Sequence, residues 1–350
     1  MKKNNILSRI KTVPRKGGFR MDGFHIWGSS IIKGDDKRYH MFASRVPNYM
    51  KFHPGWMVAS EIVRATSSTP AGVYEFEEVV LPARGATYWD GCSSHNPKII
   101  KIENNYVLFY MGSMHPYEDI TKDNSDKLTL NSKWCISGRA NKRIGIAFSK
   151  SLNGPWKRMD SPVLDVKDGT FYSFLTSNPS PCVGQDGKIY LMFKSRMHEN
   201  GVHSDMMIGM AIADHFLGPY KVISNEPIFS KIKLGEIEDP FMWSSQSGFH
   251  MLAKDQTGQI TGAHGYGILA HSSNAVDWKL DPNPLAYTKN ITWDDNKTES
   301  LGNMERCSGI FDNSGELTHL SFAIWEDEAG FGNSNTSINA RNIIVPLDCE

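Results

Sequence analysis

The stretch NPKIIKIENNYVLFYMGS (residues 96–113) places two apolar runs on either side of the polar turn ENN. Runs rich in Val, Ile, Phe, Tyr and Met that flank such a turn predict a β-hairpin. Four further stretches repeat this pattern of a small or polar start, an apolar run, a turn and a second run. They are GSSIIKGDDKRYHMFASR (28–45), NPSPCVGQDGKIYLMFKS (178–195), DPFMWSSQSGFHMLAKD (239–255) and RCSGIFDNSGELTHLSFA (306–323). The chain therefore carries five copies of one hairpin.

A second repeated unit follows the first four hairpins. Its copies align without gaps and each predicts a third strand, a turn and the start of a fourth strand. They read VRATSSTPAGVYEF (63–76), GIAFSKSLNGPWKR (145–158), GMAIADHFLGPYKV (209–222) and GILAHSSNAVDWKL (267–280). A four-stranded unit repeated in this way is a propeller blade. The sequence predicts an all-β, single-domain five-bladed β-propeller with four-stranded antiparallel blades. A β-sandwich is the alternative, but sandwiches do not repeat four-stranded units.

The fifth unit ends with ARNIIVPL (340–347), and we expect an N-terminal strand over residues 6–15 to complete that blade and close the ring. The predicted single domain spans residues 1–350. Its blades are expected at residues 22–82, 90–164, 172–230, 236–288 and 303–348.

The overall composition limits the classes of partner. Lysine plus arginine number 38, as do aspartate plus glutamate, so no net charge attracts nucleic acid or an anionic membrane surface. No apolar run has the length of a membrane span. The five cysteines have no metal-ligand spacing and are expected to be free thiols. We expect no nucleic-acid or membrane partner and a cytoplasmic protein, or a periplasmic or secreted one if an export signal has been removed. Its oligomeric state stays open.

The run IGIAFSKSLNGPWKRMDSPVL (144–164), together with the NP and DP strand starts, resembles the five-bladed propeller glycoside hydrolases. These are family 43, the invertase-type families and family 117. The likeness covers essentially the whole chain and implies a carbohydrate enzyme without specifying the sugar. In such propellers the innermost strand of each blade starts at the mouth of an axial pocket.

The resemblance implies which residues line that pocket. Aligning the hairpins places one residue of each blade in a ring around the axis, namely Gly28, Asn96, Asn178, Asp239 and Arg306. The preceding position holds Trp27, His95, Ser177, Glu238 and Glu305.

Glycoside hydrolysis needs one carboxylic acid and one carboxylate that serves as base or nucleophile. The families resembled place the acid as a glutamate directly before the strand-start position, which here gives Glu238 or Glu305. They also hold a pKa-tuning aspartate in a DP motif, which here is Asp239. The order EDP (238–240) and then ERC (305–307) is similar to that of the invertase-type RDP and EC motifs.

The first blade departs from the family pattern. Its base aspartate would belong at Trp27-Gly28-Ser29, so Asp90 is the expected base, with Asp22 as a substitute from a neighbouring loop. Each of these residues also has a simpler explanation. DP, NP and DG pairs often only form turns, with proline fixing φ and the Asx side chain binding the backbone.

Histidines offer a rival proton donor and a cation site. Family 117 enzymes use a histidine as acid, so His264 in TGAHGYG is the second candidate acid. Family 43 enzymes often hold an axial cation near a histidine such as His95. The resemblance therefore implies no required cofactor but allows a structural Ca²⁺ or Na⁺ ion near the axis. A core histidine with ordinary hydrogen bonds is the alternative for His95.

Cations and tryptophans complete the expected site. The ends of the second strands and the ring contribute Arg45, Arg196, Lys254 and Arg306. These groups either pair with the carboxylates and keep them ionised, or bind a uronate or sulfate on the sugar. Trp27, Trp89 and Trp325 could form an apolar platform for a sugar face, unless they pack between blades.

The prediction is an exo-acting, inverting glycoside hydrolase that cleaves a terminal sugar, either neutral or anionic, from a plant or algal oligosaccharide. A non-catalytic sugar-binding propeller is the alternative, favoured by the missing first-blade DP motif. A phosphorolytic propeller, with phosphate on the cationic rim, is another. A protein-interaction propeller is disfavoured by the EDP and ERC motifs.

Overall fold

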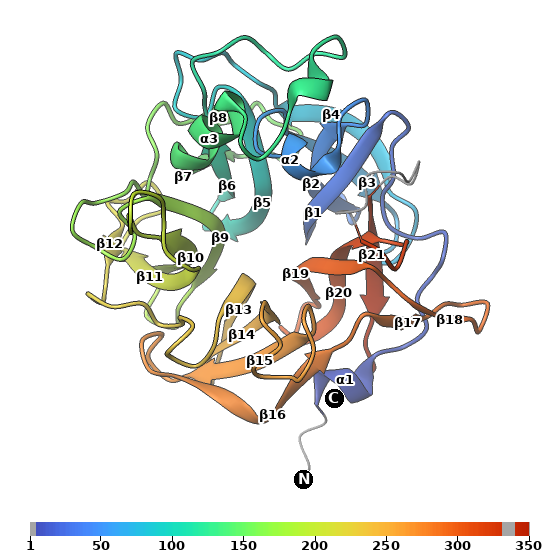
Figure 1. The fold of residues 1–350 in the computed structure, drawn as a ribbon. Helices are drawn as coiled ribbons and strands as arrows, with labels where there is room; N and C mark the ends of the chain where they lie inside the picture. The colour runs from blue at the N-terminus through green and yellow to red at the C-terminus, as the bar shows by residue number, and fades with distance from the viewer. Residues whose placement is uncertain (1–4, 331–339, 350) are drawn as a thin grey trace.

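Five antiparallel sheets stand around a common axis, with strands β1, β5, β9, β13 and β19 nearest the centre (Figure 1). The structure, a computed structural model, describes residues 5–330 and 340–349. Within each sheet the strands follow one another in chain order from the axis outward. The predicted all-β five-bladed propeller is confirmed.

The first blade contains β1 (Phe24–Lys33), β2 (Tyr39–Pro47), β3 (Glu61–Ser67) and β4 (Glu75–Leu81). The second contains β5 (Ser93–Ile102), β6 (Asn105–Ser113), β7 (Arg143–Ser149) and β8 (Lys157–Arg158). The third contains β9 (Leu175–Val183), β10 (Ile189–Arg196), β11 (Met207–Ala213) and β12 (Lys221–Val222). The fourth contains β13 (Ile237–Ser245), β14 (Gly248–Asp255), β15 (Gly267–Ser272) and β16 (Trp278–Tyr287). The fifth contains β19 (Asn303–Phe311), β20 (Leu317–Trp325) and β21 (Arg341–Pro346). The blade limits expected from the sequence are wider than these sheets and remain a proposed division. The expected fifth blade includes residues 331–339, which lie outside the described residues.

The N-terminal segment closes the fifth blade, but not as the regular strand expected over residues 6–15. Helix α1 (Ile6–Arg9) begins this segment because the Asn5 side chain accepts a hydrogen bond from the Leu7 amide at 3.1 Å. Further along, isolated bridges join residue 10 to 347 and residue 19 to 342, next to β21. Pro14 lies between them and has no N–H to donate, so regular pairing cannot continue. The position of the segment was predicted correctly, and its conformation was not.

The remaining elements are small additions to the blades. A hairpin of β17 (Asn290–Thr292) and β18 (Thr298–Ser300) joins the fourth and fifth blades. Helix α2 (Phe52–Gly55) lies between β2 and β3, whereas η1 (Ser125–Lys127) and α3 (Lys133–Ala140) lie between β6 and β7. No described helix combines the length and apolar character needed to cross a bilayer. All five cysteines are free thiols, as expected.

Apolar side chains fill the spaces between neighbouring blades. Phe42 of the first blade packs with Leu108 of the second, and Phe109 of the second packs with Phe193 of the third. Similar clusters join the third blade to the fourth, the fourth to the fifth and the fifth to the first. Full burial of one such side chain contributes about 1.5–3 kcal/mol, so these layers hold the ring of blades together.

A buried carboxylate, that of Asp90, joins the loop before β5 to strands β6 and β8 of the second blade. Both Arg84 and Arg158 contact it, at 2.7 and 2.8 Å, and the Tyr110 hydroxyl donates to it at 2.6 Å. The Asp90 side chain is 0% exposed. These partners use both of its oxygens, so a buried charge is fully hydrogen-bonded.

Replacing Asp90 with alanine should lower the free energy of unfolding by about 3–5 kcal/mol, because two guanidinium groups then lose a buried partner. The matched control is Asp160→Asn, since Asp160 contacts the same Arg84 at 2.7 Å but is 76% exposed. That change should cost at most about 1 kcal/mol in urea unfolding. Equal losses for the two variants would contradict a structural role for Asp90.

Candidate active site

Each innermost strand carries an irregularity at the same place on the axis. The ring residues Gly28, Asn96, Asn178, Asp239 and Arg306 all have positive φ, between +47° and +60°. In each blade the pairing register to the second strand shifts at this residue. Such a β-bulge turns a side chain out of its normal direction in the pleat. The bulge therefore aims a side chain at the axis in the last four blades, whereas Gly28 has none in the first.

The side chains of the ring contact one another directly. The Asn96 amide donates to Asn178 at 3.1 Å, and the Asn178 amide donates to Asp239 at 2.9 Å. Arg306 forms an ion pair with the same Asp239 oxygen. A Cβ atom on Gly28 would lie 3.0 Å from the Asn96 side-chain oxygen, so this position leaves room for its neighbour. The structure brings the five expected ring residues together.

The residues before the ring lie opposite matching positions on the second strands. Glu238 pairs with Lys254 across the fourth blade, and Ser177 pairs with Lys194 across the third. Glu305 faces Ala323 in the fifth blade, which leaves it space to reach the neighbouring lysine. Lys194 therefore comes from the third blade, Glu238 and Lys254 come from the fourth, and Glu305 comes from the fifth.

These charges form one connected cluster beside the ring. The Glu238 carboxylate contacts both the Lys194 and Lys254 ammonium groups, the second at 2.8 Å. Lys254 also contacts Glu305 at 3.1 Å, and the Asn303 amide donates to Glu305 at 3.0 Å. The side chains of Glu238 and Glu305 are 12% and 8% exposed. Two nearly buried glutamates from adjacent blades therefore share one ammonium group.

The surroundings shift the pKa values of two neighbouring carboxyl groups, those of Glu238 and Asp239, in opposite directions. Burial alone would raise the pKa of Glu238, but Lys194, Lys254 and Arg306 hold that pKa well below its ordinary value. Burial raises the pKa of Asp239 even though Arg306 opposes this. Environments that push apart the pKa values of adjacent acids are a feature of acid–base sites.

A stack of rings and a lysine lies on the same side of the axis. The Trp56 ring stacks on His95, with centroids 5.1 Å apart, and the Lys142 ammonium lies 4.0 Å from the Trp56 centroid. His95 is fully buried, and its Nδ1 contacts the Ser60 hydroxyl at 2.8 Å. Its Nε2 has no hydrogen-bond partner among the described residues. Burial and the nearby cations keep the pKa of His95 well below its usual value, so the ring is neutral.

Three acid or base candidates lie elsewhere. Asp90, the expected base, has no described contact with the axial glutamates, because Arg84 of the loop before β5 and Tyr110 and Arg158 of the second blade enclose it. Asp22 is exposed in the turn before β1. His264 is exposed in the loop after β14, where its Nδ1 contacts the Gln256 carbonyl at 2.6 Å. The contacts described for Asp22 and His264 do not connect them to the glutamates.

The expected tryptophan platform is absent from the described site. Trp27 is 1% exposed and packs on Phe52, with ring centroids 4.6 Å apart, while Trp325 is buried beside His25. Trp89 stacks on the buried Tyr110. These rings fill space around the blades, which leaves no open face for a sugar.

Of the expected cations, Lys254 and Arg306 belong to the carboxylate cluster and Arg45 does not. Arg45 pairs with Glu61 at 2.7 Å on the outer side of β2 and lies over the Phe24 ring. Arg196 contacts Nδ1 of His203 at 3.2 Å and the Ser204 carbonyl.

The axial Ca²⁺ or Na⁺ ion that the resemblance allows stays a prediction. Within residues 5–330 and 340–349 no three His, Cys, Asp or Glu side chains are grouped to hold a metal ion. The Arg306 guanidinium occupies one oxygen of Asp239, and the other has no hydrogen-bond partner in the described part of the chain. The unpartnered side-chain oxygen of Asn96 is suited to ordered water or a ligand.

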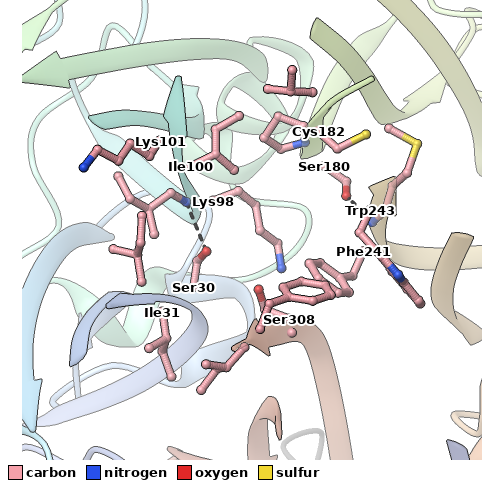
Figure 2. A pocket seen from close by; sticks show the side chains of 18 of the residues that line it. Ser30, Ile31, Lys98, Ile100, Lys101, Ser180, Cys182, Phe241, Trp243 and Ser308 are labelled. Carbon is pink, nitrogen blue, oxygen red and sulfur yellow. Dashed lines mark hydrogen bonds between the residues drawn. The ribbon is translucent and has the colours of Figure 1, made fainter. Parts of the chain in front are cut away.

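The opposite end of the axis holds an apolar cavity of about 390 Å³. Figure 2 shows its lining, which comes from the part of each inner strand beyond the ring, including Ile31, Ile100, Cys182 and Phe241. Lys98 points into it and donates to the Cys307 carbonyl at 2.8 Å. Burial lowers the pKa of Lys98 to about 8. The ring therefore separates a charged end of the axis from an apolar end.

Sequence reasoning missed Lys194, Lys142 and Arg139. Lys194 is a charge inside the apolar run IYLMFKS, and its alternation with Arg196 places both on one face of β10. This alternation in the sequence is enough to predict that Lys194 shares a face with Arg196. Arg139, in the last turn of α3, and Lys142, just after it, belong to the long insertion between β6 and β7, and no repeat predicted that the insertion returns to the axis.

No family model and no curated protein matches the chain. Solved structures do match. A family 117 glycoside hydrolase from the marine bacterium Zobellia galactanivorans is 19% identical, with a TM-score of 0.67 over 99% of this chain and 92% of that one. The endo-arabinase from Bacteroides thetaiotaomicron is 14% identical, with a TM-score of 0.57 over 97% and 98%. The Bacillus subtilis arabinanase is also 14% identical, with a TM-score of 0.57 over 92% and 97%. The chain therefore has the fold that these five-bladed glycoside hydrolases share.

Proposed function

We propose that the protein is a glycoside hydrolase whose catalytic carboxyls are Glu238 and Glu305. The observation that carries this proposal is the pair itself. Two nearly buried glutamates precede the ring in adjacent blades and are joined by Lys254. An idle pair of buried carboxylates would be costly to desolvate, which favours a role in chemistry. Similarity of fold to named glycoside hydrolases supports the same reaction class.

The charges around the two glutamates suggest different roles. Glu238 contacts two ammonium groups and stays ionised, which suits a base or nucleophile. Glu305 contacts one of these ammonium groups and is the proposed acid. In the reaction the Glu305 proton passes to the leaving oxygen as the glycosidic bond breaks, and a water molecule finally supplies hydroxyl to the sugar and a proton to the enzyme. Asp239 binds Arg306 and is proposed to position the guanidinium beside Glu238.

The burial of both acids favours an exo mode of action. Side chains 12% and 8% exposed are accessible to a chain end but not to the middle of a polysaccharide. The two oxygens that contact Lys254 lie no more than about 6 Å apart, which is a limit on the nearest oxygens and not the separation of the two carboxyl groups. Retaining enzymes have carboxyl groups roughly 5–5.5 Å apart and inverting ones about 6.5–9.5 Å, so the inversion expected from the sequence stays a prediction.

Glu238→Gln and Glu305→Gln should each lower kcat about 10²–10⁴-fold on any oligosaccharide that the native protein cleaves, because each removes a proton-transfer or nucleophilic group. The assay is release of reducing sugar from a panel of plant and algal oligosaccharides. Proton NMR of the first product should show the anomeric configuration opposite to that of the cleaved bond, as inversion requires, and a retained configuration would contradict that prediction.

The control is Asp22→Asn, which changes an exposed carboxylate in the turn before β1 and should leave kcat within about twofold. Near-native rates for both glutamate variants would show that the site is elsewhere. Binding of oligosaccharides without any turnover would favour the non-catalytic sugar-binding alternative.

The ionised state of Glu238 can also be tested without a substrate. Its pKa is lower in the folded chain than in the unfolded chain, where it is about 4.3. The stabilising contribution is therefore complete above that pH and is lost as pH falls through the folded pKa. The melting temperature of the native protein should exceed that of Glu238→Gln most at pH 7, with the gap narrowing below about pH 4. Glu226→Gln, at an exposed position, should show no such gap. A gap that does not change with pH would mean that the lysines do not hold Glu238 ionised.

A further inference from the structure

Three cations lie beside the carboxylate cluster without a carboxylate partner in the described part of the chain. They are Arg139 in α3, Lys142 directly before β7 and Arg196 at the end of β10. The ion pairs of Glu238, Asp239 and Glu305 are made with Lys194, Lys254 and Arg306. The site therefore has three more positive groups than these three carboxylates neutralise.

Lys142 is the most unusual of the three. Its side chain is buried, with the residue 5% exposed, and its ammonium lies on the Trp56 ring. Burial is the main cause that moves the pKa of Lys142 well below its ordinary value, and Lys194, Arg139 and Arg306 add to it. The Glu238 carboxylate acts in the opposite direction and raises the pKa of Lys142. Glu238 is, however, already bound to Lys194 and Lys254. A buried amine among other cations is unfavourable for folding unless an anion joins it.

A histidine lies between the two arginines. Nδ1 of His203 lies 3.2 Å from Arg196 and 3.1 Å from the Ser204 carbonyl, and Nε2 lies 3.5 Å from Arg139. Because a neutral imidazole accepts at only one nitrogen, only one of the two arginines donates to it. A histidine between two guanidinium groups is kept neutral, and its pKa is lowered by burial and by both arginines. Arg196 also donates to the Ser204 carbonyl, which fixes its direction. The Glu236 carboxylate raises the pKa of Arg196 by its charge alone. Its hydrogen bond is with the Met206 amide, which donates to it at 3.1 Å.

We propose that Arg139, Lys142 and Arg196 form a subsite for an oxyanion carried by the sugar substrate, a carboxylate or a sulfate, next to Glu238. The inference rests on the proposed hydrolase function and names its substrate class as an acidic oligosaccharide. Guanidinium groups suit both anions because their paired N–H groups match two oxygens. Inorganic phosphate has the same chemistry, and a phosphate at this place would make the enzyme phosphorolytic. The unpartnered Nε2 of His95 offers a further polar contact beside Trp56.

The proposal predicts opposite effects of one substitution on stability and on binding. Lys142→Met keeps a long apolar side chain on Trp56 and removes a buried charge from a cationic neighbourhood. Its melting temperature in the absence of anions should equal or exceed that of the native protein. Its gain in melting temperature with sulfate, phosphate, galacturonate or glucuronate should fall, corresponding to at least about tenfold weaker binding.

The experiment measures melting temperature and calorimetric binding for the full chain with four anions, namely inorganic sulfate, inorganic phosphate, D-galacturonate and D-glucuronate. Chloride at equal ionic strength and the neutral sugars D-galactose and D-glucose are the references. The variants are Lys142→Met, Arg139→Gln and Arg196→Gln. The matched control is Arg45→Gln, because Arg45 already has Glu61 as its partner and lies away from the cluster. Arg139 is half-buried, so Arg139→Gln carries the test if either of the other variants does not fold.

Selective binding of these anions that is lost in the three variants and kept in Arg45→Gln supports the subsite. Tighter binding of the uronates than of the inorganic anions would show that the anion is part of the sugar. Turnover that requires inorganic phosphate would instead make the anion a co-substrate, and would overturn the proposal that the sugar carries it. Equal effects of anions and references on native and variant proteins would also overturn it. If anions bind as expected but no acidic oligosaccharide is cleaved, the hydrolase proposal fails and the subsite stands. If acidic oligosaccharides are cleaved by the three variants with native kcat/KM, the subsite proposal fails and the hydrolase proposal stands.

Discussion

A left-handed backbone conformation at one residue of each innermost strand is the constraint on which the site depends. At positions 28, 96, 178, 239 and 306 the strand bulges, and at the last four of these it turns a side chain towards the axis. Asparagine and aspartate tolerate positive φ better than most residues, which explains three of the five positions, and glycine accepts it freely at a fourth. Arg306 is the exception, and its ion pair with Asp239 offsets the strain. The bulges fix the five blades on one centre.

The same ring divides the axis into two chemically different ends. Before the ring the chain places Glu238, Glu305 and several cations, and beyond it Phe241 and other apolar side chains line a cavity. A polar substrate would lose hydrogen bonds with water at the apolar end without gaining new ones. The charged end replaces them with ionised and amide groups. This contrast, more than the size of either end, is why we assign sugar binding to the N-terminal ends of the inner strands.

The repeat made the fold predictable, because five hairpins with a common start can bury their faces only against one another. The ring residues and the two glutamates followed from the same alignment. Predictions failed where long-range contacts decide. Asp90 has the sequence context of a site residue, yet Arg158, far along the chain, completes an enclosed ion pair with it in the second blade. Arg139 and Lys142 come from an insertion outside the repeat. The N-terminal segment lies where expected, but Asn5 and Pro14 prevent a regular strand there.

The most direct test of the account is a crystal structure of the Glu238→Gln protein soaked with an acidic oligosaccharide. The account predicts a sugar chain end on the Glu305 side of the ring, within hydrogen-bond distance of Lys254 and with its anion against Arg139, Lys142 and Arg196. A sugar found among Ile31, Ile100 and Phe241 in the apolar cavity, or Glu238 and Glu305 pointing away from a common centre, would contradict it.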